Sequence, residues 1–150
     1  MKRSFKKSMG IFMVILLSGC IGESYDFSPP TVTLVNDEDI MHKVTLAEAN
    51  IDWYYDEKYN KETKNIQALA KEQEPFYLNA GQKVGYLIED GYFEPDRISV
   101  SVLEDDSELE LELEEVESFR VPNETGEYIV VFNVESSNGN AQYVGNIVIK

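Results

Sequence analysis

Few side chains in this sequence are suited to covalent or metal chemistry. The chain of 150 residues contains one cysteine, Cys20, and one histidine, His42. These counts exclude a disulfide framework and a zinc site of the Cys/His type. A catalytic Ser–His or Cys–His pair would have to be built on His42 alone. Because His42 shares one face of a strand-like run with Val44 and Leu46, we interpret it as a packing residue.

Carboxylates are the most abundant candidate ligands, and three clusters of them fall at predicted turns, at residues 37–39, 89–96 and 104–106. Calcium prefers about six to eight oxygen ligands, so two such turns meeting at one end of a fold could hold it. None of the clusters matches the calcium-binding loop of helical calcium sensors. We therefore expect solvated turns with no metal and no cofactor. A calcium or small-ligand site in these acidic loops is the alternative.

Paired carboxylates can also hydrolyse glycosides when one of them is held protonated and the other ionised across a cleft. The chain has 28 acidic residues and no motif that singles out a pair. We therefore predict that the protein is not an enzyme.

The densest group of aromatic side chains consists of Trp53, Tyr54, Tyr55 and Tyr59. Aromatic faces provide contact area at low entropic cost, so these four residues are a candidate interaction patch for a sugar or a peptide. The alternative is that Trp53 and one tyrosine fill the core while the others cover the predicted helix. Of the two, we favour the core for Trp53.

Charge excludes one class of partner. The chain has 28 Asp and Glu against 13 Lys and Arg, which gives a formal net charge of −15. Nucleic-acid-binding proteins place clustered cations on phosphates, and the cations here are scattered, so we exclude nucleic acid. Nine Tyr, seven Phe and one Trp nevertheless supply enough aromatic mass for a packed core.

The amino terminus has the pattern of an export signal. Four basic residues and no acidic ones precede an apolar run at residues 11–17. A helix needs roughly 20 apolar residues to cross a bilayer core, so this run is too short for a permanent span. It is followed by Leu17-Ser18-Gly19-Cys20, which resembles the lipobox of bacterial lipoproteins. The resemblance implies cleavage before Cys20 and lipids on that residue.

This resemblance implies a division of the chain and an address. Residues 1–19 would be the signal peptide, 20–30 a tether ending in two prolines, and 31–150 the folded domain on the extracytoplasmic face of the cell membrane. Removal of the four leader cations leaves nine basic residues against 28 acidic ones, a net charge of −19. Anionic head groups repel such a surface, so we expect the domain to stand off the membrane.

The elements that must position these residues are mostly strands. Alternation of apolar and polar residues predicts strands, whereas apolar residues at helical spacing predict one short helix at 64–73. The leucines of the Glu-Leu run recur at every second position, which favours a strand with a wet glutamate face that also discourages edge pairing. The predicted strands are 31–35, 41–46, 51–55, 82–89, 98–102, 108–114, 125–134 and 143–149.

The last third of the chain carries the most specific fold signal. Gly126-Glu127-Tyr128 enters an alternating strand, and a polar loop then leads to a final strand. This arrangement, over residues 75–150, resembles the penultimate-strand corner of immunoglobulin-like sandwiches, in which a Tyr hydroxyl bonds to the backbone a few residues upstream. The resemblance implies that role for Tyr128. We therefore predict an all-β, mainly antiparallel, immunoglobulin-like β-sandwich with one short helix.

A sandwich on a lipid tether, without a recognisable catalytic constellation, favours one functional class. We expect a non-catalytic binding or accessory module whose partners are the membrane, through the lipid on Cys20, and an envelope protein or a cell-wall polymer.

Overall fold

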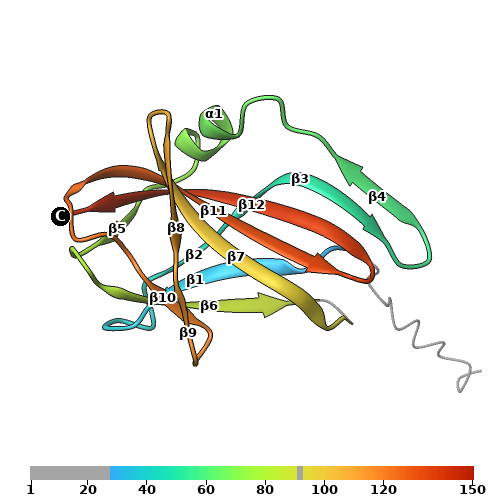
Figure 1. Ribbon diagram of the computed structural model, residues 1–150, viewed down its shortest axis with the longest axis horizontal. Coiled ribbons are helices and arrows are strands. Elements are labelled where there is room, and N and C mark those ends of the chain that lie inside the picture. Colours follow the sequence, from blue (N-terminus) through green and yellow to red (C-terminus); the bar gives the residue numbers. More distant parts are fainter. Residues whose placement is uncertain (1–27, 91–92) are drawn as a thin grey trace, which may run out of the picture.

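The computed structural model describes residues 28–90 and 93–150 and shows an all-β sandwich with one short helix, as predicted (Figure 1). The lipobox and residues 20–27 of the predicted tether lie outside the described residues. The strands are β1 (Thr31–Asn36), β2 (Lys43–Thr45), β3 (Ala47–Tyr54), β4 (Lys58–Lys61), β5 (Phe76–Leu78), β6 (Lys83–Glu89), β7 (Pro95–Glu104), β8 (Ser107–Leu111), β9 (Leu113–Glu114), β10 (Ser118–Arg120), β11 (Gly126–Ser136) and β12 (Gly139–Ile149). The helix is α1 (Ile66–Lys71).

In the described part of the chain these strands form two sheets. The smaller sheet has the order β2-β1-β6-β10-β9, and the larger has the order β4-β3-β12-β11-β7-β8. All of these neighbours are antiparallel. Strand β5 runs parallel to the last residues of β12, beyond the point where β3 ends. The mainly antiparallel prediction is therefore confirmed.

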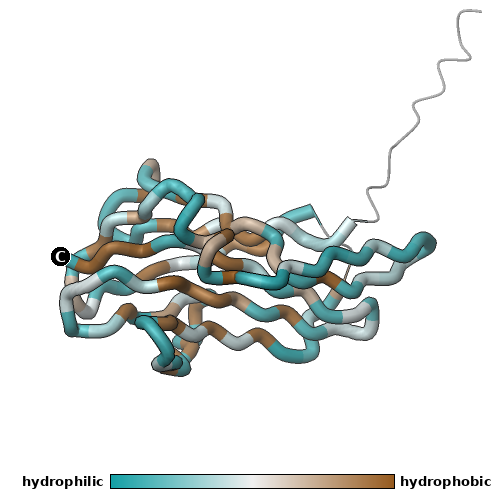
Figure 2. The backbone as a smooth tube through the Cα atoms, turned by 90° about the horizontal axis from the view of Figure 1, so that it is seen from above, coloured by the Kyte–Doolittle hydropathy of each residue, from teal (hydrophilic) through white to brown (hydrophobic). Residues whose placement is uncertain are grey.

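The main core lies between the two sheets because successive residues of a strand point to opposite faces. In β11 and β12, for example, Phe132 and Tyr143 are almost fully buried, whereas their neighbours Asn133 and Gln142 face outward. Figure 2 shows apolar residues along the middle of the strands and hydrophilic residues at the turns. Each buried aromatic or branched side chain stabilises the fold by roughly 1.5–3 kcal/mol.

The helix α1 covers only part of the outer face of the larger sheet. Asn65 caps it, because its side-chain oxygen accepts a hydrogen bond from the Ala68 backbone N–H at 2.9 Å. The helix packs on a second, smaller apolar cluster. The cluster consists of Ala49, Ala70, Ile129, Val131 and Val144, with Ala47, Ile66, Leu69 and Leu103 at its border. The rest of that outer face stays open.

The Glu-Leu run is extended, as its period of two predicted. It forms two short strands, however, where the sequence predicts one. It divides into β8, which pairs with β7, and β9, which pairs with β10 in the other sheet (Figure 1). Leu109 and Leu113 are 54% and 37% exposed, whereas Leu111 is half-buried against the main core, so the leucine face opposite the wet glutamate face is covered only in part. Because β8 and β9 are the edge strands of their sheets, neighbours cover their leucines on one side only.

The corner that suggested the fold is present. The Tyr128 hydroxyl donates to the Glu124 carbonyl oxygen at 3.1 Å, four residues upstream. Tyr128 is 5% exposed, and burial raises its pKa, with Glu104 and Glu124 adding to the effect. This bond ties the entry of β11 to the loop that precedes it, as the immunoglobulin-like resemblance implies.

A second tyrosine holds the residue that precedes β1. The buried Tyr143 hydroxyl donates to the Pro30 carbonyl oxygen. Burial raises the pKa of Tyr143 above its ordinary value of 10.0, and the negative charge of Glu48 raises it further. The beginning of β1 is therefore fastened to the centre of the larger sheet.

We expect Tyr128→Phe to lower the free energy of unfolding by about 1 kcal/mol, because one hydrogen bond is lost without a change in packing. Urea unfolding of the mature chain carrying Cys20→Ala measures this. Tyr54→Phe is the matched control, because Tyr54 is 61% exposed. Loss of its hydroxyl should leave the urea midpoint of unfolding unchanged. Equal midpoints for the two variants would contradict a stabilising role for the corner.

Stability should fall as the pH rises above 10. The unfolded chain ionises Tyr143 near its ordinary pKa of 10.0, whereas the folded chain holds the proton more tightly. The unfolded state therefore binds fewer protons above that pH, and the free energy of unfolding decreases. Unfolding midpoints between about pH 9 and pH 11 should decline less steeply for Tyr143→Phe than for the parent chain. Parallel slopes would refute the assignment.

Candidate functional site: an amide-lined trough on the larger sheet

The half of the larger sheet that α1 leaves open carries a row of uncharged polar side chains. Asn133 on β11 pairs directly with Gln142 on β12 and with Ser99 on β7. Asn50 on β3 extends the row, since its side chain bonds to that of Gln142. All four residues are half-buried and come from four neighbouring strands. The row therefore runs across the strands.

The row lies in a hollow of about 390 Å³, which we call the amide trough. The trough is lined by Asn50, Arg97, Ser99, Asn133, Val134, Glu135, Asn140, Ala141 and Gln142. A second hollow of about 380 Å³ shares Arg97, Ser99 and Asn133 and continues toward Glu108 and Glu110 on β8. The two hollows together cross the sheet from β3 to its edge.

Hydrogen bonds within the protein fix the orientation of two of the trough amides, those of Asn50 and Gln142. The Asn50 amide nitrogen donates to Gln142 Oε1 at 2.7 Å, and Asn50 Oδ1 accepts from the Thr63 backbone N–H at 2.8 Å. The Gln142 oxygen is therefore engaged, and no described residue accepts a hydrogen bond from its amide nitrogen. Asn133 makes only a long contact to the Ser99 hydroxyl, at 3.5 Å. The trough thus carries hydrogen-bonding groups that the protein itself leaves partly unused.

Charged groups stand at the borders of the trough. Arg97 and Glu135 are exposed and oppose each other in the β7–β11 pairing. On the β8 side, Glu108 accepts a hydrogen bond from the Ser101 hydroxyl at 2.7 Å. Carboxylates therefore flank a centre that is itself uncharged.

The four aromatic residues of the candidate interaction patch do not share one surface. Trp53 is 2% exposed and meets the Phe93 ring edge to face, with ring centroids 5.2 Å apart. This places Trp53 in the core, as favoured above, and removes it from any surface patch. Tyr54, Tyr55 and Tyr59 are 61%, 43% and 39% exposed.

The exposed tyrosines also face different ways. Tyr59 donates to Glu48 at 2.8 Å, and this bond raises the pKa of Tyr59. Tyr54 follows the inward-facing Trp53, so it lies on the outer face of β3, the face of the amide trough. Tyr54 therefore shares the outer face of the sheet with the trough, whereas Tyr59 pairs with the inward-facing Trp53 and lies on the opposite face of β4.

The acidic turns lie apart. The pairing of β1 with β6 puts Asn36 beside Val84 and Thr31 beside Glu89, so the turn at 37–39 and the one that begins at Glu89 are at opposite ends of the sandwich. The turn at 104–106 lies near α1, where Gln67 donates to the Asp105 carbonyl oxygen. Within residues 28–90 and 93–150, no three His, Cys, Asp or Glu side chains are grouped to hold a metal. The calcium alternative therefore gains no supporting observation.

His42 packs as the sequence suggests. Its ring lies 4.6 Å from that of Phe76, and its Nδ1 is 3.5 Å from the Asn36 amide nitrogen. These contacts give His42 a structural role at the start of β2.

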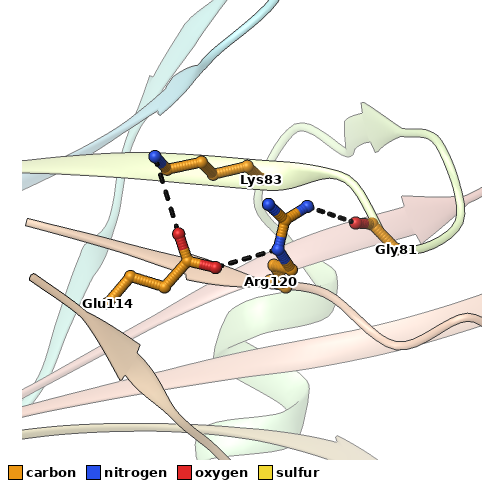
Figure 3. A network of polar contacts seen from close by, with 4 residues as sticks. All are labelled: Gly81, Lys83, Glu114 and Arg120. Carbon is orange, nitrogen blue, oxygen red and sulfur yellow. Dashed lines mark hydrogen bonds and ion pairs between the residues drawn. The ribbon is translucent and has the colours of Figure 1, made fainter. Parts of the chain in front are cut away.

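A network of three ionic side chains occupies the outer face of the smaller sheet (Figure 3). Glu114 on β9 lies 2.8 Å from Arg120 Nε and 3.5 Å from Lys83 Nζ, and Arg120 also reaches the Gly81 carbonyl oxygen. The two cations are thereby paired with a carboxylate of the protein itself. We interpret this network as a clamp that joins β9, β10 and β6.

No protein-family model matches the chain, and no curated protein sequence matches it. No helix in the described residues is both long and apolar enough to cross a membrane.

Sequence reasoning missed the amide trough, although a signal was present. Asn133 interrupts the apolar run of β11, and Gln142 does the same at the start of β12. Single polar residues of this kind are typical of any half-exposed strand. Only the register of the four strands shows that they lie side by side.

We expect Glu114→Gln to lower the free energy of unfolding by less than about 1 kcal/mol, because the ion pairs are partly exposed. The difference should shrink in high salt, which screens such pairs. Urea unfolding at low and high salt measures both effects. Lys58→Met is the control. It removes the ion pair between Lys58 Nζ and Asp52 Oδ1, which are 3.8 Å apart and more exposed, so the free energy of unfolding should hardly change. Salt-independent loss in Glu114→Gln would rule out an ionic clamp.

Proposed function

We propose that the protein is a lipoprotein on the extracytoplasmic face of the cell membrane, and that its sandwich is a non-catalytic binding or accessory module for a polymer of the cell envelope. The amide trough is the observation that carries the binding part of this proposal, and the lipobox-like run ending at Cys20 supports the anchor. The trough is already formed by oriented side chains, with Asn50 fixed on both sides by hydrogen bonds. Amides and hydroxyls of this kind hold a ligand by hydrogen bonds.

The position of the trough supports a role close to the membrane. The start of β1 pairs with the end of β6, at Glu89, and the next strand begins at Pro95, opposite Ser136 beside the β11–β12 turn. Gly139, just after that turn, pairs with Trp53 near the β3–β4 turn. The start of β1 and the two turns therefore lie at the same end of the sandwich (Figure 1). The trough residues Glu135 and Asn140 belong to this half. A chain segment as long as residues 20–27 can span at most about 29 Å. A ligand in the trough would be held within a few tens of Å of the lipid anchor.

The charge of the mature chain fits the same arrangement. A net charge of −19 keeps the domain from lying on anionic head groups. Two or three acyl chains on Cys20 supply the stable attachment that one chain would not. The anchor then holds the domain near the membrane while the trough stays accessible from the side.

Lipid anchoring depends on the only cysteine. We expect the wild-type protein to incorporate labelled palmitate and to sediment with membranes, whereas Cys20→Ala should accumulate as an unlipidated precursor. Ser18→Ala keeps a small residue before the cleavage point and is the matched control, which should behave like the wild type. Processing and labelling of Cys20→Ala at the wild-type level would refute the proposed anchor.

A further inference from the structure

We propose that the amide trough binds an uncharged, hydroxyl-rich glycan that lies across the strands; this inference rests on the proposed binding function and names its ligand class. The spacing of the row is the first argument. Neighbouring strands lie about 4.8 Å apart, so the row of Asn50, Gln142, Asn133 and Ser99 spans about 14 Å. The pairing of β12 with β3 shifts register at Gln142, and the side-chain bond to Asn50 continues the row across that shift. The distance between neighbouring strands is close to the length of one sugar ring in an extended chain.

The chemistry of the row is the second argument. A sugar hydroxyl both donates and accepts hydrogen bonds, and a carboxamide offers two donors and an acceptor. The Gln142 side-chain oxygen already accepts a hydrogen bond from Asn50. Its amide nitrogen can therefore donate to a ring oxygen or a hydroxyl oxygen of a glycan. Asn133, at the centre, has both its donor and its acceptor group largely available, with only the 3.5 Å contact to Ser99.

The charge around the trough is the third argument, because it favours an uncharged polymer over a polyanionic one. The centre of the trough is neutral, while Glu135, Glu108 and Glu110 stand around the two adjoining hollows. Arg97 is the one cation among the residues that line them. The whole mature chain carries −19. A phosphate-rich or otherwise polyanionic polymer would be repelled by this surface, whereas an uncharged glycan would not.

The apolar content of the trough argues against a protein partner at this place. Protein interfaces are centred on buried aromatic or aliphatic anchors. The apolar residues that line the trough are Val134 and Ala141, and both point into the core. Tyr54, which is exposed, lies on the outer face of β3 two residues beyond Asp52, where it can stack on a sugar ring that extends past the trough.

Isothermal titration of the mature chain carrying Cys20→Ala tests this inference. The probes are chitopentaose, cellopentaose and maltopentaose as uncharged glycans, and poly(glycerol phosphate) as the anionic polymer. We expect measurable heat with at least one uncharged glycan and none with the anionic polymer. Absence of heat with all three glycans at millimolar concentration would overturn the inference, as would tighter binding of poly(glycerol phosphate).

Two variants locate the binding. Asn133→Ala and Gln142→Ala should each weaken glycan binding about three- to tenfold, the effect of one or two lost hydrogen bonds. Asn146→Ala is the matched control, because Asn146 lies on the same face of the same strand but lines a different hollow, beside α1. Undiminished binding in both trough variants would show that the glycan binds elsewhere and would refute the site.

A folding control keeps the result interpretable. Each variant is first compared with the parent chain by urea unfolding, and Ser99→Ala, a smaller change in the same row, replaces any variant that is unstable. Palmitate labelling through Cys20 does not depend on the glycan. Failure of the titration with normal labelling would therefore reject the ligand class, whereas failure of the labelling would reject the lipid anchor.

Discussion

The register of β11 against β12 is the constraint on which both the core and the trough depend. The two strands pair along their whole length and are joined by the short turn at 137–138. Gly139 follows this turn with a φ of 132°, and a side chain there would run into the Asp52 carbonyl oxygen of β3. Because successive residues alternate between faces, a slip by one residue would bring Asn133 into the core and expose Phe132. One glycine-dependent turn thus fixes both faces of the larger sheet.

The outer face of that sheet is divided by α1. Where the helix packs, the sheet presents the apolar residues Ala49, Val131 and Val144, which form one cluster with Ala70 of the helix. Where the helix is absent, the same strands present amides and hydroxyls. The short helix therefore sets the boundary of the trough, although it contributes no side chain to its lining.

The carboxylates of the chain are placed where their mutual repulsion destabilises the fold little. Most carboxylates are at turns or on the edge strands β8 and β9, where water screens their repulsion. Glu114 is an exception, since it is paired with two of the few cations of the domain. The centre of the trough is uncharged, in contrast to this background, and this difference in charge is the basis on which we propose it as a binding surface.

The sequence alone determined the class of the fold, the alternation of most strands and the corner at Tyr128, and it favoured packing roles for Trp53 and His42. These are local properties, because a period of two or a tyrosine after a glycine can be identified within a few residues. It did not determine how residues 31–74 divide between the sheets, or that the Glu-Leu run crosses from one sheet to the other with Leu109 exposed. Nor did it bring Asn50 to Gln142, 92 positions apart in the chain. Those outcomes depend on strand order and register, which are set by the packing of distant segments against one another, so only the tertiary structure decided them.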